Sequence, residues 1–109
     1  MKWELIYLPE VEFDYQNLTR HQQIITDKAV KRVKENPLPN NEGGYGKPLG
    51  HKHGRNLTGY LKIKLQGEGI RIVYKLVRSE SKMLVIVIGI REDDKIYEIA
   101  QHRILKYKL

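Results

Sequence analysis

The chain has 109 residues and contains no cysteine. This absence excludes disulfide bonds, catalysis by a thiolate and zinc sites built from cysteine. Small secreted domains commonly depend on disulfides for their stability, so a chain of this size without them is more typical of a reducing compartment. We therefore expect a cytoplasmic protein.

Long hydrophobic runs are also missing. The longest apolar run covers residues 83–90, whereas a helix that crosses a bilayer needs about 20 such residues. The first residues do not combine a basic segment, an apolar stretch and a small-residue cleavage site. We therefore expect neither a membrane span nor a signal peptide.

The composition that is present is that of an ordinary globular protein. Hydrophobic residues make up 40% of the chain and charged residues 30%, which is typical of folded rather than disordered sequences. The length suffices for one hydrophobic core, because two domains would have only about 50 residues each. We expect a single domain over residues 1–109.

Positive charge is concentrated in the second half of the chain. Residues 1–50 hold seven basic and seven acidic side chains, whereas residues 51–109 hold thirteen and six, so the second half supplies the whole formal net charge of +7. Such asymmetry is typical of proteins that bind a polyanion, either a nucleic acid or an anionic membrane surface. The alternative is a solvated basic face that only maintains solubility.

Periodicity and turn residues predict an α+β fold. Thr19 is a suitable N-cap for an amphipathic helix over residues 20–35, and Asp93 or Asp94 for a last helix that reaches Tyr107. The expected elements are, in order, a strand at 2–8, a short helix or irregular turn at 10–18, the helix at 20–35, a long loop at 36–57, strands at 58–65, 70–77 and 82–90, and the last helix.

The short connections between the last three strands predict a small, antiparallel-dominated sheet with helices packed on one face. The strand at 82–90 lacks polar alternation, which indicates a central strand that is covered on both of its faces.

Cationic side chains converge on one face of the hairpin expected at residues 58–77. Because side chains alternate along a strand, Lys62 and Lys64 share the face opposite to the apolar one. A turn at residues 66–69 places Lys64 directly opposite Arg71. Like charges in this position repel one another, which predicts an anion site unless the side chains simply extend into water.

Two further side chains extend this cluster. Arg91 ends the strand at 82–90, and Tyr97 lies near the start of the last helix, from which a phenol can project back towards the sheet. Arginine offers bidentate contacts to a phosphate and lysine a point charge. The candidate site for a phosphodiester therefore comprises Lys62, Lys64, Arg71, Arg91 and Tyr97.

In order and spacing, several segments resemble the RelE/ParE superfamily of bacterial toxins from type II toxin–antitoxin modules. The resemblance covers nearly the whole chain and is carried by Glu35-Asn36-Pro37, Lys47-Pro48-Leu49-Gly50, Asn56-Leu57-Thr58-Gly59-Tyr60, Ile70-Arg71-Ile72-Val73-Tyr74, Val87-Ile88-Gly89-Ile90-Arg91 and Ile96-Tyr97. It implies a compact, microbial-ribonuclease-like fold and a cognate antitoxin protein as partner, with a monomeric toxin that forms a hetero-oligomer with the antitoxin.

The resemblance also implies one of two activities. RelE-like members cleave mRNA in the ribosomal A site, whereas ParE-like members inhibit DNA gyrase by binding. The side chains of the nuclease branch, two lysines in a Lys-x-Lys strand, two arginines and a tyrosine in the last helix, match Lys62, Lys64, Arg71, Arg91 and Tyr97. This favours the ribosome-dependent endoribonuclease. A ParE-like inhibitor and a catalytically degenerate relative remain as alternatives.

RNA carries its own nucleophile, so this chemistry requires no metal or cofactor. The 2′-hydroxyl attacks the adjacent phosphate, and the protein aligns the backbone, moves two protons and stabilises the dianionic phosphorane. Lys62 or Lys64 would assist removal of the 2′ proton, the two arginines would hold the non-bridging oxygens, and Tyr97 would protonate the 5′ leaving oxygen. The resemblance suggests a 2′,3′-cyclic phosphate product.

Other charged residues in the second half are weaker candidates. Lys52 and Arg55 extend the basic loop and are assigned to contacts with RNA phosphates, with solvated loop charge as the alternative. His51 and His53 have the spacing of a metal pair, but the loop supplies no cysteine or carboxylate cluster. We expect no metal site.

Overall fold

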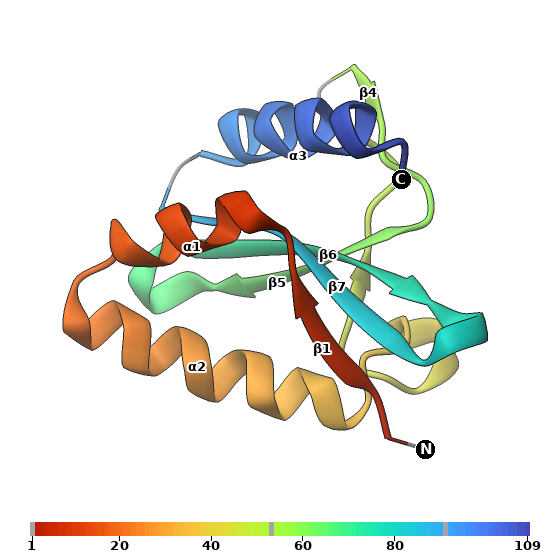
Figure 1. The fold of residues 1–109 in the computed structure, drawn as a ribbon, viewed down its shortest axis with the longest axis horizontal. Coiled ribbons are helices and arrows are strands. Elements are labelled where there is room, and N and C mark those ends of the chain that lie inside the picture. The colour runs from red at the N-terminus through yellow and green to blue at the C-terminus, as the bar shows by residue number, and fades with distance from the viewer. Residues whose placement is uncertain (1, 53, 91) are drawn as a thin grey trace.

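The computed structural model describes residues 2–52, 54–90 and 92–109 of the chain (Figure 1). Its elements in order are β1 (Glu4–Tyr7), α1 (Pro9–Gln16), α2 (Arg20–Glu35), the 3-10 turn η1 (Asn40–Glu42), β2 (Lys47–Pro48), β3 (His51–Lys52), β4 (Arg55–Asn56), β5 (Tyr60–Leu65), η2 (Gln66–Glu68), β6 (Ile70–Val77), η3 (Arg78–Glu80), β7 (Lys82–Gly89) and α3 (Asp93–Tyr107).

Five strands form one mixed sheet in the order β1-β7-β6-β5-β2. The pairs β7–β6, β6–β5 and β5–β2 are antiparallel, and β1 pairs with β7 in parallel. Strands β3 and β4 form a separate two-stranded hairpin within the long loop. The α+β class and the antiparallel-dominated sheet expected from the sequence are confirmed.

The central hairpin has the register that alternation predicts. Leu65 pairs with Ile70, Ile63 with Ile72, and Leu61 with Tyr74, so the apolar side chains of both strands share one face. The sequence therefore determined which side of these strands is apolar and which is cationic.

Helix α2 begins and ends where local signals predict. The hydroxyl of Thr19 accepts from the Gln22 amide at 3.1 Å, and the Gln22 side chain accepts from the Thr19 amide at 2.8 Å, which completes a capping box. Helix α3 differs from its prediction, because its N-cap is Glu92, whose side chain makes no capping hydrogen bond. The carboxylate of Asp94 instead pairs with Arg55 of β4.

The helices divide between the two faces of the sheet, whereas the sequence predicted all of them on one face. In Figure 1, α3 and α2 lie on opposite sides of β5, β6 and β7. The hydroxyl of Tyr74 donates to the carbonyl of Pro37, just beyond α2, while Lys62 on the other face contacts Tyr97 of α3. Helices pack on both faces of the sheet because the apolar side chains of β7 from Val85 to Ile88, which point alternately to the two faces, are all buried.

The buried side chains of the sheet and all three helices form one hydrophobic cluster. No helix in the described ranges has the length and apolar character needed to span a membrane.

Candidate active site

Lys62 and Tyr97 meet between β5 and α3. The side-chain nitrogen of Lys62 donates to the hydroxyl oxygen of Tyr97 at 3.2 Å and lies 5.9 Å from the centre of its ring. Tyr97 is only 1% exposed, and Lys62 is half-buried. The predicted return of the phenol towards the sheet is therefore observed.

Lys64 and Arg71 lie on the same face of the hairpin. They are direct cross-strand partners, as predicted, and both are half-buried. The Arg71 guanidinium donates to the carbonyl of Gly69 at 2.9 Å, and Gly69 has the positive φ of 68° that turns the chain into β6. The turn thus helps to hold the guanidinium beside β5.

Lys47 is a cation of this face that the sequence analysis did not assign to the site. It lies on β2 directly opposite Lys62 and is exposed. Residues opposite each other in an antiparallel pair share a face. The Lys47-Pro48-Leu49-Gly50 segment carries part of the family resemblance, but nothing local predicts that two residues of a long loop pair with β5.

Among the remaining predicted site residues, the structure describes Arg55. Arg91, the side chain of Lys52 and His53 lie outside the described part of the chain. Arg55 donates to Asp94 at 3.0 Å and lies 3.6 Å from Glu98, with its side chain 20% exposed. Arg55 therefore links the β3–β4 hairpin to α3, and its contact with RNA stays a prediction.

The sequence matches no family model and no curated protein, but several solved structures have a similar fold. A double-arginine mutant of the Escherichia coli toxin RelE in the free state superposes with a TM-score of 0.75 at 24% identity, over 95% of this chain and 99% of that one. The toxin in the intact E. coli RelBE toxin–antitoxin complex gives 0.62 at 22%, over 83% and 98%. The Mycobacterium tuberculosis RelBE2 toxin–antitoxin complex gives 0.65 at 16%, over 84% and 100%.

The chain has the RelE fold.

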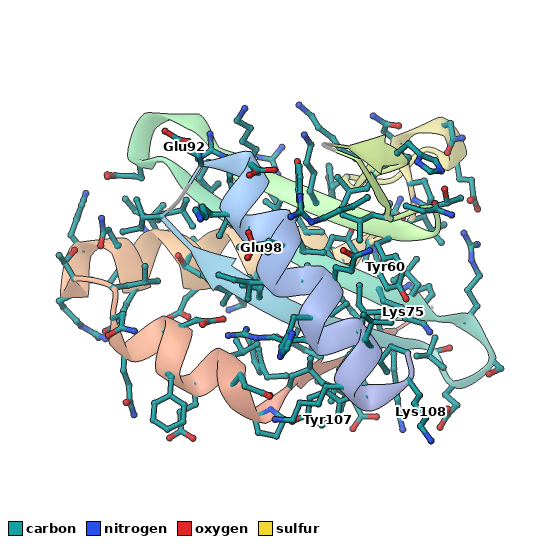
Figure 2. The ribbon with its side chains drawn as sticks, turned by 90° about the horizontal axis from the view of Figure 1, so that it is seen from above. Tyr60, Lys75, Glu92, Glu98, Tyr107 and Lys108 are labelled. Atoms are coloured by element: carbon teal, nitrogen blue, oxygen red, sulfur yellow. The ribbon has the colours of Figure 1, made fainter. Side chains whose placement is uncertain are left out.

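Within this RelE fold, Figure 2 looks down on α3 where it crosses the sheet. Glu92 lies at one end of the helix and Tyr107 and Lys108 at the other, while Tyr60 and Lys75 emerge beside it. The hydroxyl of Tyr60 donates to the carbonyl of Leu109 at 3.0 Å. Burial raises the pKa of Tyr60, which keeps its phenol neutral and able to hold the end of the chain against β5.

The opposite side of α3 is fastened to α1. Lys106 and Tyr107 both donate to the Glu10 carboxylate at 2.8 Å, and these hydrogen bonds lower the Glu10 pKa to about 2. Nearby, Arg103 forms an ion pair with Asp14. The sequence carried no signal for either pairing, because the partners are 89 or more residues apart.

The described residues contain no group of three histidine or acidic side chains that could hold a metal ion. The cations and the phenol of this face can bind an anion, offset developing negative charge and transfer protons.

Proposed function

We propose that this protein is a RelE-type toxin, a ribosome-dependent endoribonuclease that cleaves mRNA in the A site and is neutralised by an antitoxin. The observation that carries the proposal is the contact of Lys62 with Tyr97, on the sheet face that also holds Lys64 and Arg71. The RelE fold supports it, because this fold is found in solved toxins of that name.

The arrangement suits the attack of a 2′-hydroxyl on its own phosphate. Arg71 can take two non-bridging oxygens at once, and its position beside Lys64 concentrates positive charge where the phosphorane would develop. Lys62 is the donor in its bond to Tyr97, so this bond does not consume the phenol proton. Tyr97 would then protonate the 5′ leaving oxygen.

The contact between Lys62 and Tyr97 also suggests different roles for the two lysines. Lys62 is engaged with the proposed acid, whereas Lys64 lies one pleat further along β5, opposite Arg71. We therefore assign assistance at the 2′-hydroxyl to Lys64 and support of Tyr97 to Lys62. Because Tyr97 is 1% exposed, we expect RNA to reach its hydroxyl through a local shift of the Lys62 side chain.

The partner of the toxin would be an antitoxin. RelE has been solved with an antitoxin peptide and in an intact complex, which supports this assignment for the same fold. A segment of the antitoxin would cover the cationic face or displace α3 and thereby block mRNA. Docking of a co-expressed antitoxin on the charge-neutral first half alone would contradict this model.

Primer extension on an mRNA in a translating extract tests the activity, with a DNA gyrase cleavage assay beside it. We expect cuts in frame with codons at positions occupied by ribosomes, none in the same mRNA without ribosomes, and no effect on gyrase. Gyrase-dependent DNA breaks without mRNA cuts would instead identify an inhibitor that acts by binding, and neither effect would identify a degenerate relative.

A further inference from the structure

An ion pair substitutes for a neighbouring strand along part of β7. The pairing of β1 with β7 ends at Tyr7 and Val85, and the Leu8 amide makes one further bond to the Val85 carbonyl at 3.1 Å. Beyond this point the Asp14 carboxylate accepts from the Ile88 amide at 3.1 Å. The Arg103 guanidinium donates to the Ile86 carbonyl at 2.9 Å.

The two side chains also bind each other in a bidentate manner. Arg103 donates to the two Asp14 oxygens at 2.6 and 3.0 Å, and each side chain is only 13% exposed. Such a buried fork is geometrically restrictive, because both groups lose water and gain fixed partners. The exposed pair of Arg78 with Glu42 has the same bidentate form, but its side chains are 55% and 43% exposed.

On α3, Arg103 and Tyr97 flank the apolar stripe that packs on the sheet. Arg103 follows Ile96 by seven residues, or about two turns, so the two side chains lie on nearly the same side of the helix. Tyr97 lies about 100° round the helix axis from Ile96. Ile96 and Ala100 are fully buried between them. The helix is thus tied to β5 on one side of the stripe, through Lys62, and to β7 and α1 on the other.

Apolar packing alone does not fix the side of α3 that faces β7 and α1. A cavity of about 310 Å³ opens between α3 and α1, beside the contact of Ile96 with the end of β7, and Ile90, Ile99, Asp14 and Arg103 line it. Apolar contacts are non-directional, so the apolar stripe by itself does not define the rotation of the helix; near the end of α3, Lys106 and Tyr107 add directed contacts to Glu10. The ion pair bridges this space with four directed hydrogen bonds.

We propose that Arg103, held by Asp14, is a positioning residue for the nuclease: it fixes the rotation of α3 and thereby places the Tyr97 hydroxyl at Lys62. This inference rests on the proposed function for its effect on cleavage, but its structural part does not. Arg103 itself touches no reacting atom in this arrangement.

The test compares Arg103→Gln, Arg103→Lys and Asp14→Asn with Arg78→Gln, which removes the exposed bidentate pair as a matched control. Two quantities are measured in each: the rate and half-saturating concentration of mRNA cleavage on ribosomes, and the NMR signals of the Tyr97 ring, assigned with Tyr97→Phe. If Arg103→Gln fails to fold, the double variant Asp14→Asn/Arg103→Gln, which buries no unpaired charge, takes its place.

We expect Arg103→Gln and Asp14→Asn to shift the Tyr97 signals and to lower kcat by about 100-fold, the scale of a misplaced catalytic group, with KM little changed. Arg103→Lys should recover part of the rate, because it keeps the charge but not the fork. Arg78→Gln should match the wild type in both measurements.

Unshifted Tyr97 signals in a folded Arg103→Gln protein would overturn the proposal, whatever the rate. Loss of cleavage without a shift would mean that Arg103 acts on RNA directly, which also overturns it. If the wild-type protein does not cut mRNA, the proposed function fails, but the Tyr97 signals still decide whether Arg103 positions α3.

Discussion

Ile96 fills the space that a side chain on Gly89 would require: a Cβ at Gly89 would lie 2.7 Å from the Ile96 Cδ1 atom. Gly89 ends β7 and is the cross-strand partner of Arg71. The close approach of α3 to the sheet, and with it the position of Tyr97, therefore depends on the absence of a side chain at Gly89.

Gly89→Ala should push α3 away from β7. We expect the free energy of unfolding in urea to fall by about 1–3 kcal/mol, the cost of overpacking a core, with a loss of mRNA cleavage. Gly67→Ala is the control, because a Cβ there meets no atom within 4 Å and surface changes usually stay within about 0.5 kcal/mol. Equal stability of the two variants would show that Ile96 moves aside without cost.

Removal of the hydroxyl from Tyr97 and from Tyr74 should have opposite consequences. Tyr74 is fully buried, burial raises its pKa, and its hydroxyl donates to the Pro37 carbonyl at 2.8 Å. Tyr74→Phe should lower the free energy of unfolding by about 1–3 kcal/mol because it leaves that carbonyl unsatisfied, and should retain cleavage. Tyr97→Phe should retain the fold and lose about 10²–10⁴-fold in cleavage rate.

Thermal unfolding and primer extension on both tyrosine variants check this crossed pattern. Full cleavage by Tyr97→Phe would exclude the phenol from the mechanism. Inactivity of Tyr74→Phe at a temperature where the variant is folded would show that loss of this buried hydroxyl affects cleavage, so that the variant is not a valid control.

Arg71→Ala should abolish toxicity and mRNA cleavage while the protein stays folded, because the variant loses the proposed bidentate phosphate ligand of the cationic face. Arg71→Lys keeps the charge without the fork and should recover only part of the rate. Lys75→Ala is the matched control, since it also removes a cation from β6. Lys75 lies beside α3, far from the helix end at Glu92 (Figure 2). Growth assays and circular dichroism test this set, and a toxic Arg71→Ala protein would refute the assignment.

Glu10 should make stability depend on pH in the acid range. Its pKa falls from 4.5 to about 2 in the folded protein, chiefly through the hydrogen bond from Lys106. A carboxylate with a lowered pKa stabilises the folded state at pH values above its pKa in the unfolded chain. This stabilisation is lost as the pH falls from about 4.5 towards 2. Because water screens this partly exposed pair, we expect a contribution below about 1 kcal/mol.

Urea unfolding of wild type and Glu10→Gln at pH 7, 4.5, 3 and 2 measures this effect. The variant should be less stable at pH 7, and the difference should shrink through the lower values. A difference that is constant across this range would show that packing, rather than the charge of Glu10, links α1 to α3.

The sequence by itself determined the features that depend on near neighbours along the chain. The capping box at Thr19 involves residues three apart, and the register that places Lys64 opposite Arg71 follows from strand alternation and a four-residue turn. For the same reason the cationic face of the hairpin was predictable, and a resemblance of ordered segments was enough to predict the fold.

Only the tertiary structure decided what depends on segments far apart in the sequence. It placed β1 parallel to β7, divided α2 and α3 between two faces, engaged Arg55 with α3 and joined Asp14 to Arg103 across 89 residues. Periodicity shows which face of a helix or strand is apolar, but not which surface will cover it. That choice is made when the whole chain packs, and it determines whether Tyr97 reaches Lys62.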